Sequence, residues 1–328
     1  MIFDAHLDLA YNALRGREVL RPAREQVTDA EGIPTVGLPD LRAGHVTRIC
    51  ATIFCEPKRG GPTGYTTPAE AFEMATAQLD WYHAQFDAGE MKLIDSTSGG
   101  ASDSSRAIET IILLEGADPM RTPDDVAHFF ARGVRVVGLA WKRTRYAGGT
   151  GEPGPLTPEG VELVRELDRV GMIHDASHLA EESFWQLLKL TDGPIVASHS
   201  NARALVPTDR QLSDDMARAV ASRGGVIGIN FFDKFLVAPA EYGRHRATLD
   251  DVVTHVRHFC NVIGSTRHVG LGTDMDGGLG REQIPVEIQT SADLPRVADA
   301  LRANGFDDTD VQNIMGENWT RFFEQNLK

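Results

Sequence analysis

The chain has 328 residues, of which 41% are hydrophobic, and its formal net charge is −14. This length and apolar content allow a sizeable core in one large domain or two ordinary ones. The negative charge, without a long Lys/Arg run, argues against nucleic acid or an anionic membrane as a partner. The three cysteines, Cys50, Cys55 and Cys260, are too few for a disulfide framework and predict free thiols in a reducing compartment.

Membrane insertion and export are not expected from this sequence. The apolar runs fall short of the roughly 18–20 residues that a membrane helix requires. No charged segment followed by an apolar one precedes the first predicted strand, and residues 322–328 are too polar for an anchor. We therefore expect a cytoplasmic protein.

Eight short apolar runs recur along the chain, and each is followed by a polar loop and a helix-like segment. Nearly continuous apolar runs are typical of strands that are buried on both faces, as in a parallel sheet. The expected strands cover residues 1–10, 48–55, 108–116, 134–141, 171–178, 194–200, 225–232 and 269–276.

Amphipathic patterns between these runs predict helices. They cover residues 67–88, 158–170, 180–190 and 249–263, and Pro68 suits the first turn of the first of them. Eight strand–helix units predict an α/β fold, a (β/α)8 TIM-like barrel that forms a single domain over residues 1–328. The alternative is an open doubly wound sheet, but the Gly-rich turn that usually follows its first strand is absent.

Four long loops rich in Gly and Pro follow predicted strands. They cover residues 56–68, 143–158, 232–248 and 277–293. Loops after the strands of a barrel lie on the face that carries active sites, so these four are expected to wall one pocket. Ordinary surface insertions are the alternative interpretation.

The first strand ends in a possible metal-binding pair, His6 and Asp8. Residues two apart on a strand point to the same side, so the imidazole and the carboxylate would project together. Such a pair can bind a divalent metal ion. The structural alternative is a packed histidine followed by an aspartate that caps a helix.

Later strands end in further potential ligands. Glu115 follows four aliphatic residues, where a carboxylate is costly to bury unless it is paired or metal-bound. His178, His199 and Asp274 end three other predicted strands. In a barrel these ends converge, and the nitrogen and oxygen ligands suit zinc or a similar divalent ion. Two ions bridged by one carboxylate are a common arrangement for hydrolysis.

Each of these residues also has a structural alternative. Glu115 could pair with a nearby arginine, and His178 could cap the helix that begins near residue 180. Asp274 and Asp276 could form a turn before Gly277. The metal-site hypothesis is favoured because it explains all of them together.

From the first strand to the segment 316–323 (GENWTRFF), the chain resembles the membrane dipeptidase family, also called renal-type dipeptidases, of the amidohydrolase superfamily. The His-x-Asp at residues 6–8 marks this branch, since many amidohydrolases instead begin with His-x-His and bridge their metals with a carbamylated lysine. The resemblance implies a zinc-dependent dipeptidase in which two divalent ions share a hydroxide that attacks the peptide bond. Its dipeptide substrates would include those with a D-residue at the second position.

The resemblance also implies the ligand set of the two ions. His6 and Asp8 hold one zinc ion, Glu115 bridges both ions, and His178 and His199 hold the second.

The remaining roles follow from the same resemblance. Arg210, in Thr-Asp-Arg-Gln, matches the arginine that binds the substrate carboxylate, and Asp274 matches the catalytic acid near the metals. Phe232 stands where many relatives have a tyrosine at the substrate site. His174 has no transferable role, so we expect it to pack or to support the site.

One departure concerns the end of the fourth predicted strand, where the family usually carries a histidine that contacts the substrate carbonyl. This chain has Trp141 there, which offers one N–H and no positive charge. Either metal alone stabilises the oxyanion, or Lys142, Arg143 or Arg145 substitutes, or the substrate differs.

Other functions therefore stay open. They are hydrolysis of another small amide or ester, such as an N-acyl amino acid, a barrel that keeps its metals without catalysis, and a purely structural barrel. Relatives are often dimers, so a homodimer is one assembly that the resemblance allows.

Overall fold

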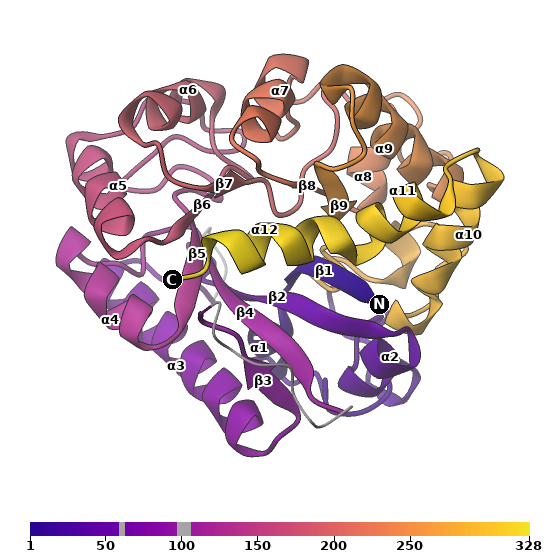
Figure 1. The fold of residues 1–328 in the computed structure, drawn as a ribbon. Coiled ribbons are helices and arrows are strands. Elements are labelled where there is room, and N and C mark those ends of the chain that lie inside the picture. Colours follow the sequence, from indigo (N-terminus) through magenta and orange to yellow (C-terminus); the bar gives the residue numbers. More distant parts are fainter. Residues whose placement is uncertain (59–62, 97–105) are drawn as a thin grey trace.

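The computed structural model of the chain describes residues 1–58, 63–96 and 106–328. Over these ranges, nine strands form one sheet, and all of its pairings are parallel (Figure 1). Eight of them follow the order β7-β6-β5-β4-β2-β1-β9-β8, and β3 pairs with the first residues of β4. The strands are β1 Ile2–Leu7, β2 Val46–Phe54, β3 Met91–Leu93, β4 Ile108–Glu115, β5 Val134–Gly138, β6 Ile173–Asp175, β7 Ile195–Val196, β8 Ile227–Ile229 and β9 Val269–Leu271.

Backbone hydrogen bonds bring the two ends of this sheet together. Ala197 N donates to Val226 O at 3.0 Å, and Gly228 N donates to Ala197 O at 2.8 Å, which links the end of β7 to β8. The result is a nearly closed barrel of eight parallel strands. The predicted (β/α)8 fold is therefore confirmed, and the open doubly wound sheet is not formed.

The observed strands are shorter than the predicted ones at their C-terminal ends. β6 stops at Asp175 and β7 stops at Val196, although the apolar runs extend further. His178 and Asp274, which lie just beyond β6 and β9, have φ angles of 63° and 60°, in the left-handed region that no strand uses. The polar residues that follow these strands therefore lie in tight turns at one end of the barrel.

The four predicted helices are present as α3, α5, α6 and α9, with bounds within one residue of the prediction. Helix α3 begins with a capping box, in which Thr67 and Glu70 exchange side-chain-to-backbone hydrogen bonds. The helices are α1 Leu9–Leu14, α2 Leu38–Ala43, α3 Pro68–Asp87, α4 Val126–Ala131, α5 Pro158–Val170, α6 Glu181–Leu190, α7 Asp214–Ser222, α8 Asp233–Leu236, α9 Leu249–Ile263, α10 Pro295–Ala303, α11 Asp308–Gln312 and α12 Asn318–Asn326.

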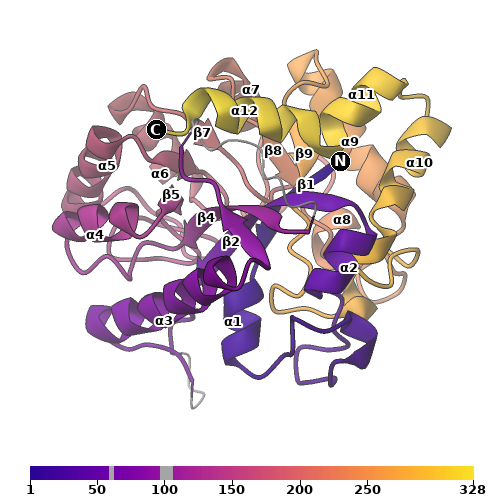
Figure 2. The ribbon, with the colours of Figure 1, turned by 60° about the horizontal axis from the view of Figure 1, so that its bottom comes forward.

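The last helix, α12, covers one end of the barrel. Its residues Trp319, Phe322 and Phe323 form a buried cluster with Phe3 and other inward-facing residues from the starts of the strands. Figures 1 and 2 show α12 crossing this end, with both termini of the chain on the same side. The opposite end, where the strands finish, is the end that carries the polar turns.

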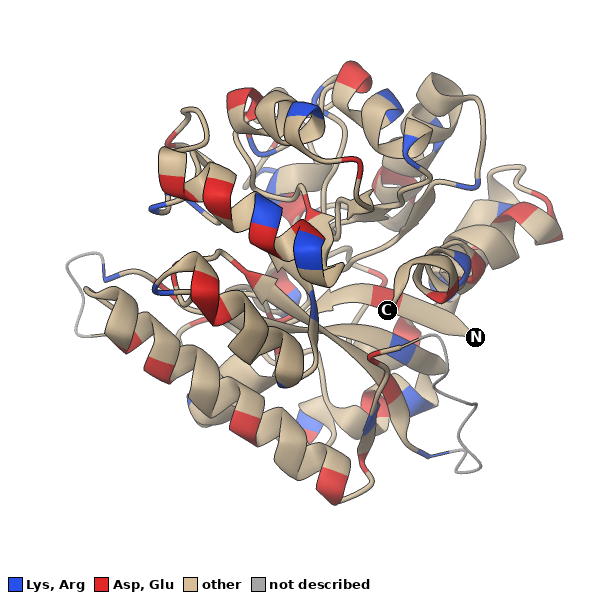
Figure 3. Cartoon of the chain, turned by 60° about the vertical axis from the view of Figure 1, so that its left-hand side comes forward, with Lys and Arg blue, Asp and Glu red and all other residues tan. Residues whose placement is uncertain are grey.

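The outer helices carry most of the visible charge, and acidic and basic residues are interspersed among them (Figure 3). Helix α3 is an exception, because its charged residues are all acidic. None of the helices in the described ranges is both long enough and apolar enough to cross a membrane. The three cysteines are free; Cys50 and Cys55 are buried and Cys260 is partly buried.

Candidate active site

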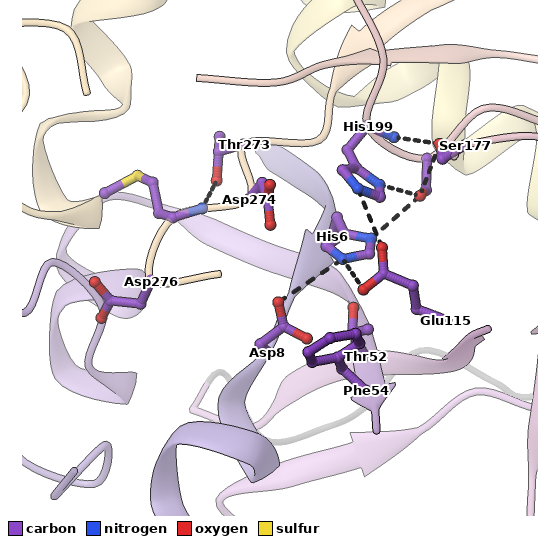
Figure 4. Close-up of polar contacts among 12 residues, drawn as sticks. His6, Asp8, Thr52, Phe54, Glu115, Ser177, His199, Thr273, Asp274 and Asp276 are labelled. Atoms are coloured by element: carbon purple, nitrogen blue, oxygen red, sulfur yellow. Dashed lines mark hydrogen bonds and ion pairs between the residues drawn. The ribbon is translucent and has the colours of Figure 1, made fainter. Parts of the chain in front are cut away.

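The five predicted metal ligands meet at the C-terminal end of the barrel, although they come from distant parts of the sequence. Nε2 of His6 lies 3.8 Å from an oxygen of Asp8 and 3.8 Å from Oε2 of Glu115. Figure 4 shows His6 between these two carboxylates, with Asp274 on its other side. The predicted projection of His6 and Asp8 from one strand end is therefore what the structure contains.

The other oxygen of Glu115 faces the remaining two histidines. Oε1 lies 3.2 Å from Nε2 of His178 and 3.3 Å from Nε2 of His199, and the two Nε2 atoms are 3.0 Å apart. Glu115 thus stands between two ligand groups and presents one carboxylate oxygen to each. Sets of three possible ligand atoms, all within 4.8 Å of one another, include His6–Asp8–Glu115 and Glu115–His178–His199.

Several polar atoms in this cluster are buried without a hydrogen-bond partner. Among the described residues, these atoms include Nε2 of His6, Oδ1 of Asp8 and Oε1 of Glu115. Buried polar atoms are rarely left unsatisfied in proteins, so each one requires an explanation. A divalent cation would be a partner for all three atoms, and the nitrogen and oxygen donors fit such an ion.

The electrostatics of the protein alone favour neutral ligands. Burial, reinforced by neighbouring carboxylates, raises the pKa of Asp8 and of Glu115 well above the usual range. Burial, helped by the positive charge of Arg210, lowers the pKa of His6 to about 3, and it also lowers the pKa values of His178 and His199. Neutral imidazoles are ready to bind a metal, and a cation would favour the ionised carboxylates.

The predicted turn before Gly277 is present, because Gly277 N donates to the carbonyl of Asp274 at 2.9 Å. The structural alternatives for Asp8, Glu115 and His178 do not hold. Asp8 precedes α1, but its side chain makes no capping hydrogen bond. The ion-pair partners of Glu115 in the described ranges are histidines, not an arginine. Helix α6 has Ala180 at its N-cap and no side-chain cap, so His178 does not serve that purpose.

Asp274 lies at the edge of the same cluster. Its Oδ2 accepts a hydrogen bond of 2.8 Å from Nδ2 of Asn230, and its backbone N–H donates to the carbonyl of His6. Burial raises the pKa of Asp274 to about 7, although Arg210 and Asn230 oppose the shift. Gly277 allows this placement, because a Cβ there would lie 2.0 Å from Oδ1 of Asp274.

Asp276 lies only two residues away, but it has a structural role. Its carboxylate accepts hydrogen bonds from the backbone of Thr35 and Val36 and from the Thr35 hydroxyl, and it lies 3.1 Å from Arg17. Figure 4 shows its side chain directed away from His6 and Glu115. Asp276 therefore fastens the segment after α1 to the end of β9.

A cavity of about 470 Å³ opens over the cluster. Each of the four long loops contributes to its wall, as predicted, through Glu56, Thr150, Phe232 and Gly277 among others. Residues 59–62 of the first loop lie outside the described residues. The sequence prediction missed Tyr11, Arg15 and Glu31, which line the cavity from the segment that follows β1.

Trp141 and Phe232 both line this cavity, where they were predicted to meet substrate. Of the three cations considered as substitutes for the missing histidine, Lys142 lines the cavity too. Arg143 instead donates to the carbonyl of Pro153, and Arg145 donates to the carbonyls of Met120 and Arg121.

Arg210 is buried beside the cluster. Its Nη2 donates to the carbonyl of His199 at 2.6 Å, its Nη1 donates to Oγ of Ser200 at 3.0 Å, and its guanidinium lies over the ring of Phe235. Phe235 belongs to the cavity wall, whereas Arg210 is absent from the described residues that form it. Its positive charge nevertheless interacts electrostatically with the carboxylates of Asp274 and Glu115.

The residues that support the ligands were missed as well. Nδ1 of His178 contacts Oγ1 of Thr150 at 3.0 Å, and Ser198 contacts two of the ligand histidines. Asn230 carried a usable signal, because it is a polar residue directly after the aliphatic run of β8, as Glu115 is in β4. His174 is packed against Asp168, as expected, with Nε2 at 2.8 Å from Oδ1.

Comparison with known proteins supports the family resemblance that the sequence motifs indicate. A family model described as membrane dipeptidase (peptidase family M19) matches residues 1–328. The chain belongs to the membrane dipeptidase family. The cluster of histidines and carboxylates and the cavity over it therefore belong to a barrel of this family.

Two relatives of this chain illustrate its sequence identity to other proteins and the share of each protein that is matched. An uncharacterized Klebsiella pneumoniae protein from the pqqA 5′ region is 35% identical over 251 residues, 71% of this chain and 88% of that protein. The dipeptidase tcpJ of Claviceps purpurea is 34% identical over 220 residues, 64% of this chain. The matched segment spans 49% of the fungal dipeptidase.

Two solved structures share the whole fold. A metallopeptidase named dipeptidase AC is 28% identical, with a TM-score of 0.82, and 99% of this chain and 98% of that chain are covered. A metallopeptidase from Rhodobacter sphaeroides, liganded with a phosphinate mimic of L-Ala-D-Ala, is 26% identical with a TM-score of 0.83. The coverage is 100% of this chain and 99% of that chain.

Proposed function

We propose that this protein is a binuclear metal-dependent dipeptidase that uses two divalent ions, with zinc as the native metal. The observation that carries this proposal is the position of Glu115. Its two carboxylate oxygens face two separate groups of ligand atoms. Within the described ranges, Oε1 of Glu115 itself, Nε2 of His6 and Oδ1 of Asp8 are buried without a hydrogen-bond partner.

In this proposal His6 and Asp8 hold one ion, His178 and His199 hold the other, and Glu115 bridges them. When bound, the two ions supply a water of lowered pKa and polarise the scissile carbonyl. Asp274 accepts the proton from the attacking water and returns it to the leaving amine, a transfer worth roughly 10²–10⁴-fold in rate. Asn230 holds one oxygen of Asp274, which leaves the other oxygen for the proton.

The substrate is bound as a small zwitterion. We assign the substrate carboxylate to Arg210, which would become accessible if the ring of Phe235 turned aside. Lys142 takes the place of the missing histidine at the scissile carbonyl, because it lines the cavity next to Trp141. A D-residue at the second position fits this proposal, since the similar Rhodobacter protein was crystallised with a mimic of L-Ala-D-Ala.

The first experiment measures metal content and activity together. The protein is stripped with a chelator, reloaded with zinc, manganese or iron, and analysed for bound metal. Each form is then assayed on L,L- and L,D-dipeptides. We expect two zinc ions per chain and hydrolysis of both series, while Glu115→Gln should lose metal and activity together. A wild-type protein that binds no metal after reloading would overturn the proposal.

A second experiment separates the roles of the cations on free and C-terminally amidated dipeptides. Arg210→Met should raise KM for free dipeptides far more than for amidated ones. Lys142→Met should lower kcat on both substrates equally, and Arg143→Met, a neighbouring cation directed elsewhere, should change neither. An equal effect of Arg210→Met on both substrates would count against its assigned role.

N-acyl amino acids are a second candidate substrate class. The aromatic rings of Phe54, Trp141, Phe232 and Phe235 in the cavity wall favour it, because an acyl chain would pack against them. The same metal-loaded protein, assayed with acyl amino acids beside dipeptides, distinguishes the two classes by kcat/KM.

A further inference from the structure

A single buried hydroxyl, that of Ser198, lies between two of the histidines of the cluster. Its Oγ is 3.1 Å from Nδ1 of His6 and 2.8 Å from Nδ1 of His199. The two rings lie close together, with centroids 3.7 Å apart, and Figure 4 shows them side by side. Each ring turns its other nitrogen, Nε2, toward Glu115.

The same hydroxyl contacts the carboxylate of Asp175 at 2.5 Å. The other carboxylate oxygen accepts from the backbone N–H groups of Ser177 and Ser198, at 2.9 and 2.8 Å. Among the described residues, the hydrogen bonds to this carboxylate all come from donors, so both of its oxygens act as acceptors. A more distant contact, 3.4 Å to Oγ of Ser177, competes poorly for the hydroxyl proton.

Counting protons then fixes the state of both imidazoles. A serine hydroxyl has one proton to donate and two lone pairs to accept with. Because the proton of Ser198 goes to Asp175, the hydroxyl can only accept from His6 and His199. Both rings must therefore carry their proton on Nδ1, and both present an Nε2 lone pair to the metal side.

We propose that Ser198, oriented by Asp175, is a positioning residue that sets the tautomer of His6 and His199 together and so couples the two metal positions. This inference rests on the proposed binuclear function, because the two histidines belong to different ligand groups. His178 provides the contrast, since its Nδ1 contacts a separate hydroxyl, that of Thr150.

The direct test needs no metal, and it uses variants only to assign the signals. Nitrogen-15 NMR of the metal-free protein with labelled histidine reports which ring nitrogen is protonated. We expect Nδ1–H on both His6 and His199, assigned by loss of each signal in His6→Gln and His199→Gln. A proton on Nε2 of either ring would overturn the inference, whether or not the protein proves to be a dipeptidase.

Metal affinity, measured by competition with a chromophoric chelator, gives the second test. Ser198→Ala should lower the affinity for both ions, by roughly 10–100-fold each. Thr150→Val should weaken only the ion held by His178, and Ser177→Ala, which removes a neighbouring hydroxyl without an imidazole contact, should weaken neither. Loss of a single ion, or unchanged affinities, in a folded Ser198→Ala protein would contradict the proposed coupling.

Asp175→Asn makes the sharpest prediction. Its amide oxygen should keep the two backbone N–H groups, so its NH₂ group faces Ser198 and donates to it. The hydroxyl can then accept from one imidazole only and must donate to the other. We expect one ring to switch to Nε2–H and one metal position to weaken. If both rings stay Nδ1–H, Asp175 does not orient the hydroxyl.

Discussion

Asp274 differs from the other carboxylates of the cluster because a neutral amide, that of Asn230, holds one of its oxygens. In the protein without bound metal, burial raises the pKa of Asp274 to about 7. Its second oxygen is the one that we propose to carry the proton. Asp274→Asn should therefore keep both metals and lower kcat by roughly 10²–10⁴-fold. Metal analysis and steady-state kinetics on the same sample check this expectation.

Asp276→Asn is the matched control for that substitution. Asp276 has the same left-handed backbone, with a φ of 64°, but its carboxylate holds Thr35 and Val36. We expect a lower free energy of unfolding with little change in kcat. Near-normal turnover in Asp274→Asn would show that another group moves the proton.

At this scale the sequence pointed to the proposed metal ligands better than to the residues that contact them. Glu115 and His199 could be predicted because a polar side chain at the end of an aliphatic run is costly without a partner. Ser198 and Thr150 could not, since serine and threonine are common in loops and gain their role only where the fold brings an imidazole to them. Arg210 was located, but its burial behind the cavity wall was not foreseen.

Helix α8, Asp233–Leu236, places a buried carboxylate next to the cavity wall. Burial raises the pKa of Asp233 to about 6, and Arg246, 3.9 Å away, only partly opposes this. The folded protein therefore binds this proton more tightly than the unfolded chain, so stability falls as pH rises from about 4 to about 6.

Asp233→Asn should remove that pH dependence. We expect the variant to gain on the order of 1–3 kcal/mol relative to wild type between pH 4 and pH 8. Urea unfolding of both proteins at the two pH values measures the gain, and the other titrating groups cancel in the difference. A gap between the two proteins that does not change with pH would contradict the raised pKa.

Helix α12 makes a different contribution, at the far end of the barrel. Trp319 is fully buried, stacks on Phe323 and donates from Nε1 to the carbonyl of Leu271 at 2.9 Å. Trp319→Ala should cost about 3–5 kcal/mol in the free energy of unfolding, because it leaves a large cavity. Denaturant unfolding measures that loss.

Trp319→Phe, which keeps most of the packing, should cost much less. Neither variant should change KM or metal content in the folded protein, because the metal cluster lies at the opposite end. A large change in KM would mean that the two ends are coupled.

Among the elements, regular periodicity decided what could be predicted. Helices α5 and α9 have clear amphipathic patterns and were predicted closely. The strands were overextended, most clearly β7, which covers Ile195–Val196 and is continued only by a single bridge at Ala197, although the predicted strand spans residues 194–200. The segment from α1 to α2 has no strong period, which is why its contribution to the cavity wall was missed.

For the molecule as a whole, bound metal would cross-link strands on different sides of the barrel and so stabilise the fold. The ligands come from β1, β4 and the turns after β6 and β7, so ions held there join strands on different sides of the sheet. Chelation should lower the melting temperature, and zinc at 1,000 times its Kd should restore about 4 kcal/mol. Calorimetry over a zinc titration measures this effect.

Glu115→Gln is the control for that titration, and its melting temperature should respond much less to zinc. A wild-type melting temperature that is independent of zinc would show that the cluster does not hold the ion tightly.

Both ends of the chain lie beside α12 (Figures 1 and 2). The cavity lies at the other end of the barrel. This placement matters for how the protein can be handled. A flexible tether on either end would attach the molecule to a bead or an electrode with the opening of its cavity toward the solution. Immobilised protein should then keep the turnover of the free form, and tags at either end should be tolerated.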